Sequence, residues 1–372
     1  MYFLLCIQWG ISSTQMPIYI HELGGSPFEV GLVYTVFAGI MVLASPLWGS
    51  FSDFLGKKKI FLVLGMLGLT PIFAIIAYQK EAFPIILLRG STAIFVGAIQ
   101  SITWALVSDI SSPKVIGRNL GIFNTVQISG FAIGPVIGGI IVDIYSFSAL
   151  WFFVSGICFL GGLIFLFLGS DSKKIKREKS KGLFFKGLTK SDSISKIIMM
   201  CVSYPLFLLG HTLLGPNLNI YLFKDLNFSQ TMVGITNFIG TGISAIIQPF
   251  TGVYSDKYGR KKFFILTAIL LILGNILLIQ SRTPLFVTLS LILIRYMNSF
   301  QLLSSAYVND IIPTEEKSGA LGLLNATGSL AWSLGAAIGG LIITASNIPT
   351  VIFIANLFPV FGIIIIMLSL KE

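Results

Sequence analysis

Long apolar runs alternate with short polar breaks along the whole chain. A helix that crosses the hydrocarbon core of a bilayer needs about 20 mainly apolar residues, and the chain holds twelve such runs. They span approximately residues 2–20, 30–51, 60–79, 83–107, 117–141, 147–168, 197–223, 232–254, 263–279, 285–308, 320–343 and 348–370. The pattern predicts an all-α membrane protein with twelve transmembrane helices. It lacks the alternating segments of about ten residues that are typical of a transmembrane β-barrel.

Composition supports this prediction. Of the 372 residues, 55% are hydrophobic and 11% are charged, and the mean hydropathy is +0.89. A soluble domain keeps roughly a quarter of its residues charged. The chain therefore has too few charges to cover a water-facing surface.

The formal net charge of +10 orients the chain and does not indicate nucleic-acid binding. Twenty of the 25 lysines and arginines lie on one side, in the gaps after the even-numbered helices and at the carboxyl end. By the positive-inside rule, that side is cytoplasmic. We expect a multi-pass protein of the cell membrane with both termini in the cytoplasm, in which the basic excess contacts anionic lipid.

The cysteines and the first residues exclude two other readings. Cys6, Cys158 and Cys201 lie in apolar runs, without the spacing of a metal site or a disulfide framework. Residues 1–20 lack a charged leading segment and are expected to form a membrane helix instead of a signal peptide. Because the chain starts inside this helix, a few starting residues could be missing.

The chain divides into two halves. The long polar segment that follows the sixth helix is basic and rich in serine. We expect a first bundle of six helices over 1–170, a cytoplasmic linker over 171–195 and a second bundle over 196–372.

The halves are internal repeats. At an offset of 203, Gly49, Asp53 and Gly56 fall on Gly252, Asp256 and Gly259. At 201, Asp109 falls on Asp310 and the stretch GPVIGG falls on GAAIGG. Two similar bundles of the same orientation can rock about a site between them, which is typical of transporters.

The repeated charged loops carry a family resemblance. Residues 49–59 and 252–262 fit the form G-x-x-x-D-x-x-G-[RK]-[RK], which resembles the hallmark loop of the major facilitator superfamily. The matching residues are Gly49, Asp53, Gly56, Lys57 and Lys58, and then Gly252, Asp256, Gly259, Arg260 and Lys261. The resemblance covers the whole chain. It implies that Asp53 and Asp256 bias the conformation, each attracted to the positive amino end of a helix in the opposite half.

Two further patterns concern the first half. Residues 89–93, RGSTA, partly match the family's R-x-x-x-G element, with alanine in place of glycine. The fifth helix fits g-x-x-x-G-P-x-x-G-G, a pattern associated with antiporters and above all with drug/proton antiporters. Its residues are Gly130, Gly134, Pro135, Gly138 and Gly139. Generic packing of small residues is the alternative explanation.

The resemblance also implies that helices 1, 4, 7 and 10 line a central cavity. Each of the four carries a stripe of polar side chains, as a cavity helix should. The candidate substrate-binding residues are Gln8, Ser12, Gln15, Tyr19, Arg89, Thr92, Gln100, His211, Asn219, Arg295, Asn298 and Ser305.

Charge at membrane depth separates the hypotheses about the substrate. An arginine there costs at least about 2.5–3.5 kcal/mol, so Arg89 and Arg295 are functional candidates. His211 can titrate near neutral pH. All fifteen acids map to loops or helix ends. Drug exporters of the family commonly carry a buried carboxylate, so its absence puts proton coupling and cationic drugs in doubt and favours neutral or anionic solutes.

Three functions follow in order. The first is a secondary active transporter of a small organic solute, an exporter of drugs or metabolites driven by a proton or other ion gradient. The second is a symporter or exchanger for an organic or phosphorylated anion. The third is a sensor without transport activity or a membrane enzyme, although the chain shows no cluster of an acid, a base and a nucleophile. We expect no cofactor and no metal, a small-molecule substrate and the bilayer as partners, and a functional monomer.

Overall fold

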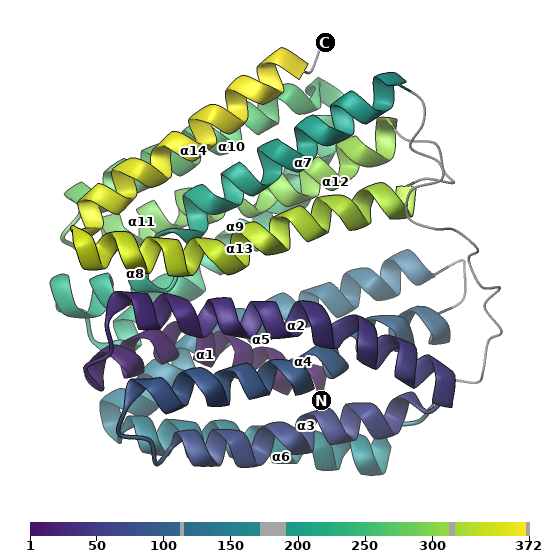
Figure 1. Ribbon diagram of the computed structural model, residues 1–372, viewed down its shortest axis with the longest axis vertical. Coiled ribbons are helices and arrows are strands. Elements are labelled where there is room, and N and C mark those ends of the chain that lie inside the picture. Colours follow the sequence, from purple (N-terminus) through teal and green to yellow (C-terminus); the bar gives the residue numbers. More distant parts are fainter. Residues whose placement is uncertain (112–114, 172–190, 312–316, 370–372) are drawn as a thin grey trace. The chain divides into compact units, whose positions relative to one another are not determined.

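The computed structural model describes residues 1–111, 115–171, 191–311 and 317–369, and within these ranges the regular elements are all helices (Figure 1). Most of the predicted linker, residues 172–190, lies outside the described residues. The first half contains α1 (Tyr2–Glu22), α2 (Pro27–Leu55), α3 (Lys58–Ile76), α4 (Ala82–Ile110), α5 (Ile116–Ile144) and α6 (Phe147–Leu168).

The second half contains more, shorter pieces. They are α7 (Ser191–Thr212), α8 (Asn217–Ile220), the π-helical turn η1 (Tyr221–Asp225), α9 (Gln230–Tyr258), α10 (Arg260–Gln280), α11 (Pro284–Arg295), α12 (Asn298–Ile311), α13 (Lys317–Ala345) and α14 (Ile348–Ser369).

The prediction of twelve spans is confirmed. Among the described residues, eleven segments are long and apolar enough to cross a membrane, with α7 to η1 and α11 to α12 each forming one span. The remaining helix, α1, is less apolar because it carries Gln8, Ser12 and Gln15, yet these three side chains are fully buried. With α1 the chain has the twelve helices of the predicted fold.

The described chain forms two compact units. Unit 1 comprises Met1–Arg177 and Pro216–Phe238, and unit 2 comprises Glu178–Gly215 and Ile239–Glu372. The segment Pro216–Phe238, which follows α7 in the sequence, thus groups with the helices of the first half.

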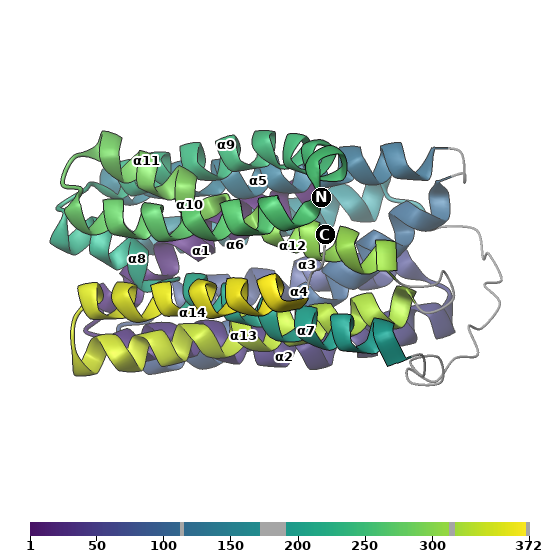
Figure 2. The same ribbon diagram turned by 90° about the horizontal axis from the view of Figure 1, so that it is seen from above.

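Helix pairing repeats between the halves. In unit 1, α1 packs on α5, and α3 packs on both α4 and α6. In unit 2, α7 lies beside α13 and α14, and α10 packs on both α11 and α14 (Figures 1 and 2). The pairs α1·α5 and α7·α13 correspond under the sequence repeat, as do α3·α6 and α10·α14.

Glycines set the close approach of α1 and α5. A Cβ atom on Gly134 would lie 2.4 Å from the Ile7 carbonyl oxygen, and one on Gly10 would lie 2.2 Å from that of Phe131. Neither backbone oxygen can move aside without displacing its helix. Because lipid offers no hydrophobic drive for helices to associate, contacts of this kind hold the pair together.

Two predicted helices are interrupted, which corrects the sequence analysis. The seventh is broken at residues 213–216, and the tenth is broken between Arg295 and Asn298. Pro216 accounts for the first break because it has no N–H to donate. Pro205, which we also expected to cause an irregular turn, lies inside α7.

The second break has no proline. The amide of Ser299 donates to Tyr296 O at 2.9 Å, and the Ser244 hydroxyl donates to Arg295 O at 2.8 Å. A regular helix would satisfy that carbonyl from the amide four residues later. The side chain of Ser244 on α9 replaces the missing helical bond, which makes the break tolerable inside a membrane.

We expect Gly134→Val to lower the apparent Tm of the detergent-purified protein by several degrees, because the added side chain overlaps the α1 backbone. Gly121→Val is the matched control, since Gly121 lies on the same helix with no described heavy atom within 4 Å of its Cβ position. Thermal unfolding monitored by size-exclusion chromatography measures both. Equal loss in the two variants would contradict the glycine contact.

Candidate functional site

Each repeated charged loop turns at a glycine with a left-handed backbone. Gly56 follows α2 with φ 64°, and Gly259 follows α9 with φ 93°. Residues with a side chain rarely adopt such φ values. The two loops then differ, because α3 begins two residues after Gly56 and α10 begins directly after Gly259.

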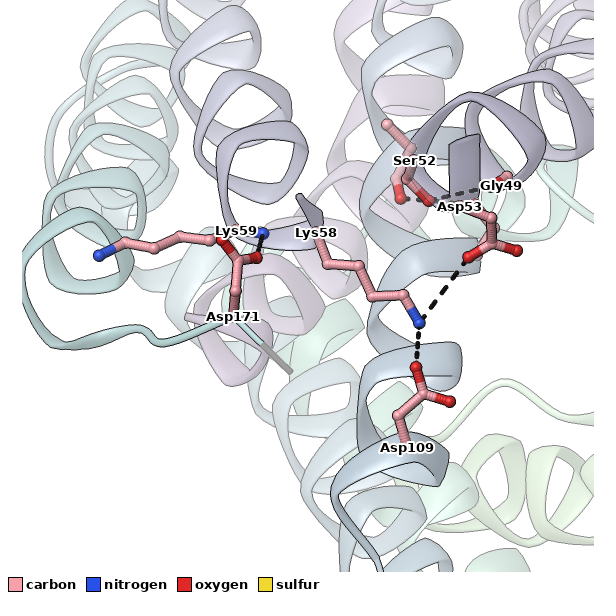
Figure 3. A network of polar contacts seen from close by, with 9 residues as sticks. Gly49, Ser52, Asp53, Lys58, Lys59, Asp109 and Asp171 are labelled. Atoms are coloured by element: carbon pink, nitrogen blue, oxygen red, sulfur yellow. Dashed lines mark hydrogen bonds and ion pairs between the residues drawn. The ribbon is translucent and has the colours of Figure 1, made fainter. Parts of the chain in front are cut away.

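In the first loop, Lys58 bridges two carboxylates (Figure 3). Its Nζ contacts the Asp109 carboxylate at the end of α4 and lies 3.9 Å from Asp53 Oδ1. The side chains of Lys58 and Asp109 are 9% and 14% exposed, whereas that of Asp53 is 72% exposed. The contact with Asp109 is therefore the shielded one.

The second loop repeats this arrangement with a shift of one residue. Arg260 Nε lies 2.6 Å from Asp310 Oδ2, and Arg260 Nη2 lies 2.8 Å from Asp256 Oδ1. The offset of 203 aligns Arg260 with Lys57, yet Arg260 does what Lys58 does. In both loops the paired base is the first residue of the next helix, so the helix start decides which base is paired.

The sequence analysis missed Asp109 and Asp310 as members of these loops. A signal existed, because the two aspartates align in the repeat at an offset of 201. The predicted attraction of Asp53 and Asp256 to the opposite half joins the two units and stays a prediction. Among the described residues of unit 1, no heavy atom lies within 4 Å of a Cβ placed on Gly49. Gly252 meets Leu302 at 3.4 Å.

The polar stripe of α1 is buried inside unit 1. Gln8 Nε2 donates to the Ser12 hydroxyl at 2.8 Å, and the Tyr34 hydroxyl of α2 donates to the Ser12 and Ser13 carbonyls at 3.2 and 3.1 Å. Gln8 Oε1 has no hydrogen-bond partner among the described residues. One acceptor of this group is thus left for a solute or water.

Gln15 and Tyr19 continue the stripe. Both polar atoms of the Gln15 side chain lack a hydrogen-bond partner among the described residues, although the side chain is fully buried. Tyr19 donates to Gln79 O at 2.7 Å, beyond the end of α3. An unpaired buried amide costs on the order of 1–3 kcal/mol, so Gln15 is the most conspicuous candidate of α1.

Asn219 joins the same region from the second half. Its Nδ2 donates to Ser13 O at 3.2 Å, and its Oδ1 accepts from Asn237 Nδ2 at 3.0 Å. The structure thus brings Asn219 to Ser12 and its neighbours in unit 1. His211, which the sequence placed on the same stripe of helix 7, belongs to unit 2.

Arg89 lies on α4 with 5% exposure. Its guanidinium lies 4.2 Å from the centre of the Phe37 ring, and its Nη1 donates to the Thr92 hydroxyl at 3.3 Å. The ion pairs among the described residues do not include Arg89. An aromatic face partly compensates a buried cation, but it leaves the charge formally unneutralised. Gln100, farther along α4, is half-buried.

The candidates of unit 2 surround the break between α11 and α12. Arg295 is the last residue of α11, the exposed Asn298 begins α12, and Ser305 is half-buried one helical face further on. The half-buried His211 ring lies 6.2 Å from the Trp332 ring of α13. The described residues contain no group of three or more His, Cys, Asp or Glu that could hold a metal ion.

The glycine pattern of α5 contacts two helices of unit 1. A Cβ on Gly130 or Gly138 would meet Cys6 or Gln15 of α1 at 2.8 and 3.0 Å. A Cβ on Gly139 would instead meet Gln230 O of α9 at 2.3 Å, and Pro135 O lies as close to a Cβ on Gly234. The pattern therefore lets α5 approach α1 with one face and α9 with another.

Comparison with known proteins identifies the family. The family model described as Major Facilitator Superfamily matches residues 1–210 and 200–372. An uncharacterised MFS-type transporter of Methanocaldococcus jannaschii is 27% identical over 88% of this chain and 85% of its own. The multidrug resistance protein MdtG of Proteus mirabilis is 26% identical over 68% of this chain and 64% of its own.

A multi-drug resistance efflux pump of Streptococcus pneumoniae, PmrA, is 25% identical over 73% of this chain and 69% of its own. Among solved structures, a mutant of the nucleoside transporter NupG matches with a TM-score of 0.82 at 15% identity, covering 100% of this chain and 98% of its own. An identity this low supports the fold alone.

We expect Lys58→Met to destabilise the protein by about 2 kcal/mol, because it leaves the shielded Asp109 carboxylate without its ammonium partner. Arg260→Met should cost less than about 1 kcal/mol, since Asp310 is more than half exposed. Lys57→Met, at an exposed lysine of the same loop, is the control. Denaturant unfolding in detergent ranks the three, and a larger effect at Arg260 than at Lys58 would refute the difference in burial.

Proposed function

The chain belongs to the major facilitator superfamily, and from this we propose that it exports a small organic solute by alternating access, driven by a proton or other ion gradient. The observation that carries the direction of transport is the glycine pattern of α5. It fits the antiporter form over its full length, and its glycines lie at backbone contacts with α1 and α9.

The named relatives support the word drug. MdtG and PmrA are called multidrug resistance and efflux proteins, and they match more than two thirds of this chain. Exporters of this kind accept solutes of varied shape, which suits a site built from amides and aromatic rings instead of a fixed set of charges. The described amides of Gln8 and Gln15 offer such hydrogen-bonding groups.

Orientation is part of the proposal. The positive-inside distribution places both termini and both charged loops in the cytoplasm of a cell whose plasma membrane holds the protein. Export then means that the solute enters from the side of Lys58 and Arg260 and leaves from the opposite face.

Transport into proteoliposomes tests the proposal. With imposed proton and sodium gradients, we expect gradient-dependent flux of at least one compound from a chemically diverse panel of drugs and metabolites. The direction should reverse when the gradient is reversed, since the solute and the ion share one binding cycle. Liposomes that hold Gly134→Val protein, reconstituted in equal amount, are the control for leakage. Flux that ignores both gradients would overturn the proposal of secondary active transport.

A second candidate function is exchange of an organic or phosphorylated anion. Arg89 favours it, because this buried guanidinium is found in no ion pair among the described residues. A planar guanidinium binds carboxylate and phosphate oxygens with two parallel hydrogen bonds. A bound anion would thus neutralise a charge that the Phe37 ring and the Thr92 hydroxyl only partly stabilise.

For anion exchange, we expect Arg89→Gln to lower anion uptake at least roughly 100-fold, and Arg89→Lys to restore part of it, because lysine keeps the charge but not the bidentate geometry. Arg118→Gln, at an exposed position, should leave uptake unchanged. Vesicle uptake of labelled organic acids and phosphate esters provides the measurement. Undiminished uptake by Arg89→Gln would rule this function out.

A further inference from the structure

The amino end of α9 is capped by a carboxylate from α5. Asp143 Oδ1 accepts from the Gln230 amide at 3.1 Å, and Asp143 Oδ2 accepts from the Thr231 amide at 2.8 Å. The Met232 amide is satisfied locally by the Ser229 hydroxyl at 3.1 Å. All three amides of the first turn are therefore paired, two of them by a residue almost 90 positions earlier in the sequence.

The repeat shows that this dependence on α5 is particular to α9. At the offset of 203, Ser229 of α9 corresponds to Ser26 of α2. Helix α2 caps itself with a complete capping box, in which the Glu29 amide donates to the Ser26 hydroxyl and the Glu29 carboxylate accepts from the Ser26 amide. Its first residue is Pro27, which has no amide to satisfy.

Both features are lost in α9. Gln230 stands where α2 has Pro27, so one more amide needs an acceptor, and Met232 stands where α2 has Glu29, so the local carboxylate is gone. A helix amino end carries roughly half a positive charge and favours a carboxylate. Asp143 supplies from α5 the charge that Glu29 supplies within α2.

The neighbouring backbone contacts add to the cap. Gly139 of α5 lies against Gln230 O and Gly234 of α9 lies against Pro135 O, each with its Cβ position 2.3 Å from the oxygen. Two helices that meet through glycines and a charge-assisted cap fit in one arrangement and lose both contacts when they separate. Such a pair has two discrete states.

The chain path places this contact on the face opposite to the loops of Lys58 and Arg260. Helices α5 and α9 alternate in direction with their neighbours, so the carboxyl end of α5 and the amino end of α9 share that face. The contact joins a helix of the first sequence half to a helix of the second, within unit 1.

We propose that Asp143 is a gating residue: its cap on α9 holds the face opposite to the charged loops closed, and the transport cycle breaks the cap each time that face opens. The proposal rests on alternating access, but not on the identity of the solute. It is one-sided, because Thr344, which corresponds to Asp143 at the offset of 201, uses its hydroxyl on Gly340 O of its own helix.

Spin-label distances in liposomes without solute test the proposal. Tyr78→Cys, at the end of α3, and Lys224→Cys, in η1, are exposed positions on the face in question. The three native cysteines are buried and serve as the unlabelled background. We expect one short-distance population in the parent and a roughly tenfold higher ratio of long to short distances in Asp143→Ala, because a charge-assisted cap is lost.

The variant Met232→Glu separates gating from helix stability. It rebuilds the sequence Ser-x-x-Glu at the start of α9, so Asp143→Ala/Met232→Glu keeps a capped helix that is no longer tied to α5. The double variant should recover thermal stability while its distances stay long. Recovery of the short distance as well would show that Asp143 is only a structural cap and would overturn the proposal.

Asp171→Ala is the matched control. Asp171 Oδ1 accepts from the Lys59 amide at 2.6 Å and so caps α3 from within the first half, on the face of the charged loops (Figure 3). Its loss should leave the Tyr78–Lys224 distances unchanged. Unchanged distances in Asp143→Ala would also refute gating, whatever the transport assay shows, whereas absent flux with shifted distances would refute the proposed function alone.

Discussion

The interior of a bilayer offers no water to polar groups, and the rest of the structure follows from this constraint. Where helix 10 breaks, the carbonyl of Arg295 receives the hydroxyl of Ser244. Where α9 starts without its own carboxylate, Asp143 supplies one. Where the protein leaves a buried amide such as Gln15 without a partner, that group is available to a solute. Structural contacts and candidate binding groups are thus distinguished by whether the protein itself satisfies them.

The two repeats share a scaffold and differ in how its polar groups are paired. Both charged loops place the first base of the following helix against an aspartate at the end of a later helix, but the base comes one residue earlier in the second loop. The first pair is shielded and the second is largely exposed. Helix α2 caps itself, whereas α9 depends on α5. Duplication explains the common fold, and these differences allow the two faces of the protein to be controlled separately.

Much of the fold could be predicted from the sequence, since length and polarity suffice to place a membrane helix. The interruption near Arg295 could not, because no proline or glycine marks it and its cause is a hydroxyl on a helix about 50 residues away. The polar stripe of α1 was recognised, but its partners Tyr34 and Asn237 come from other helices and leave no periodic signal. The aspartates Asp109 and Asp310 were visible as a repeat, although their role depends on which residue starts the next helix.

Alternating access requires the two faces to open in turn. The most direct measurement is a pair of distance distributions in one liposome sample, one between labels at Tyr78 and Lys224 and the other between labels at the exposed Lys57 and Lys257 on the loop side. The account predicts that any condition that lengthens one distance shortens the other. Both distances lengthening together, or one changing while the other stays fixed, would contradict it.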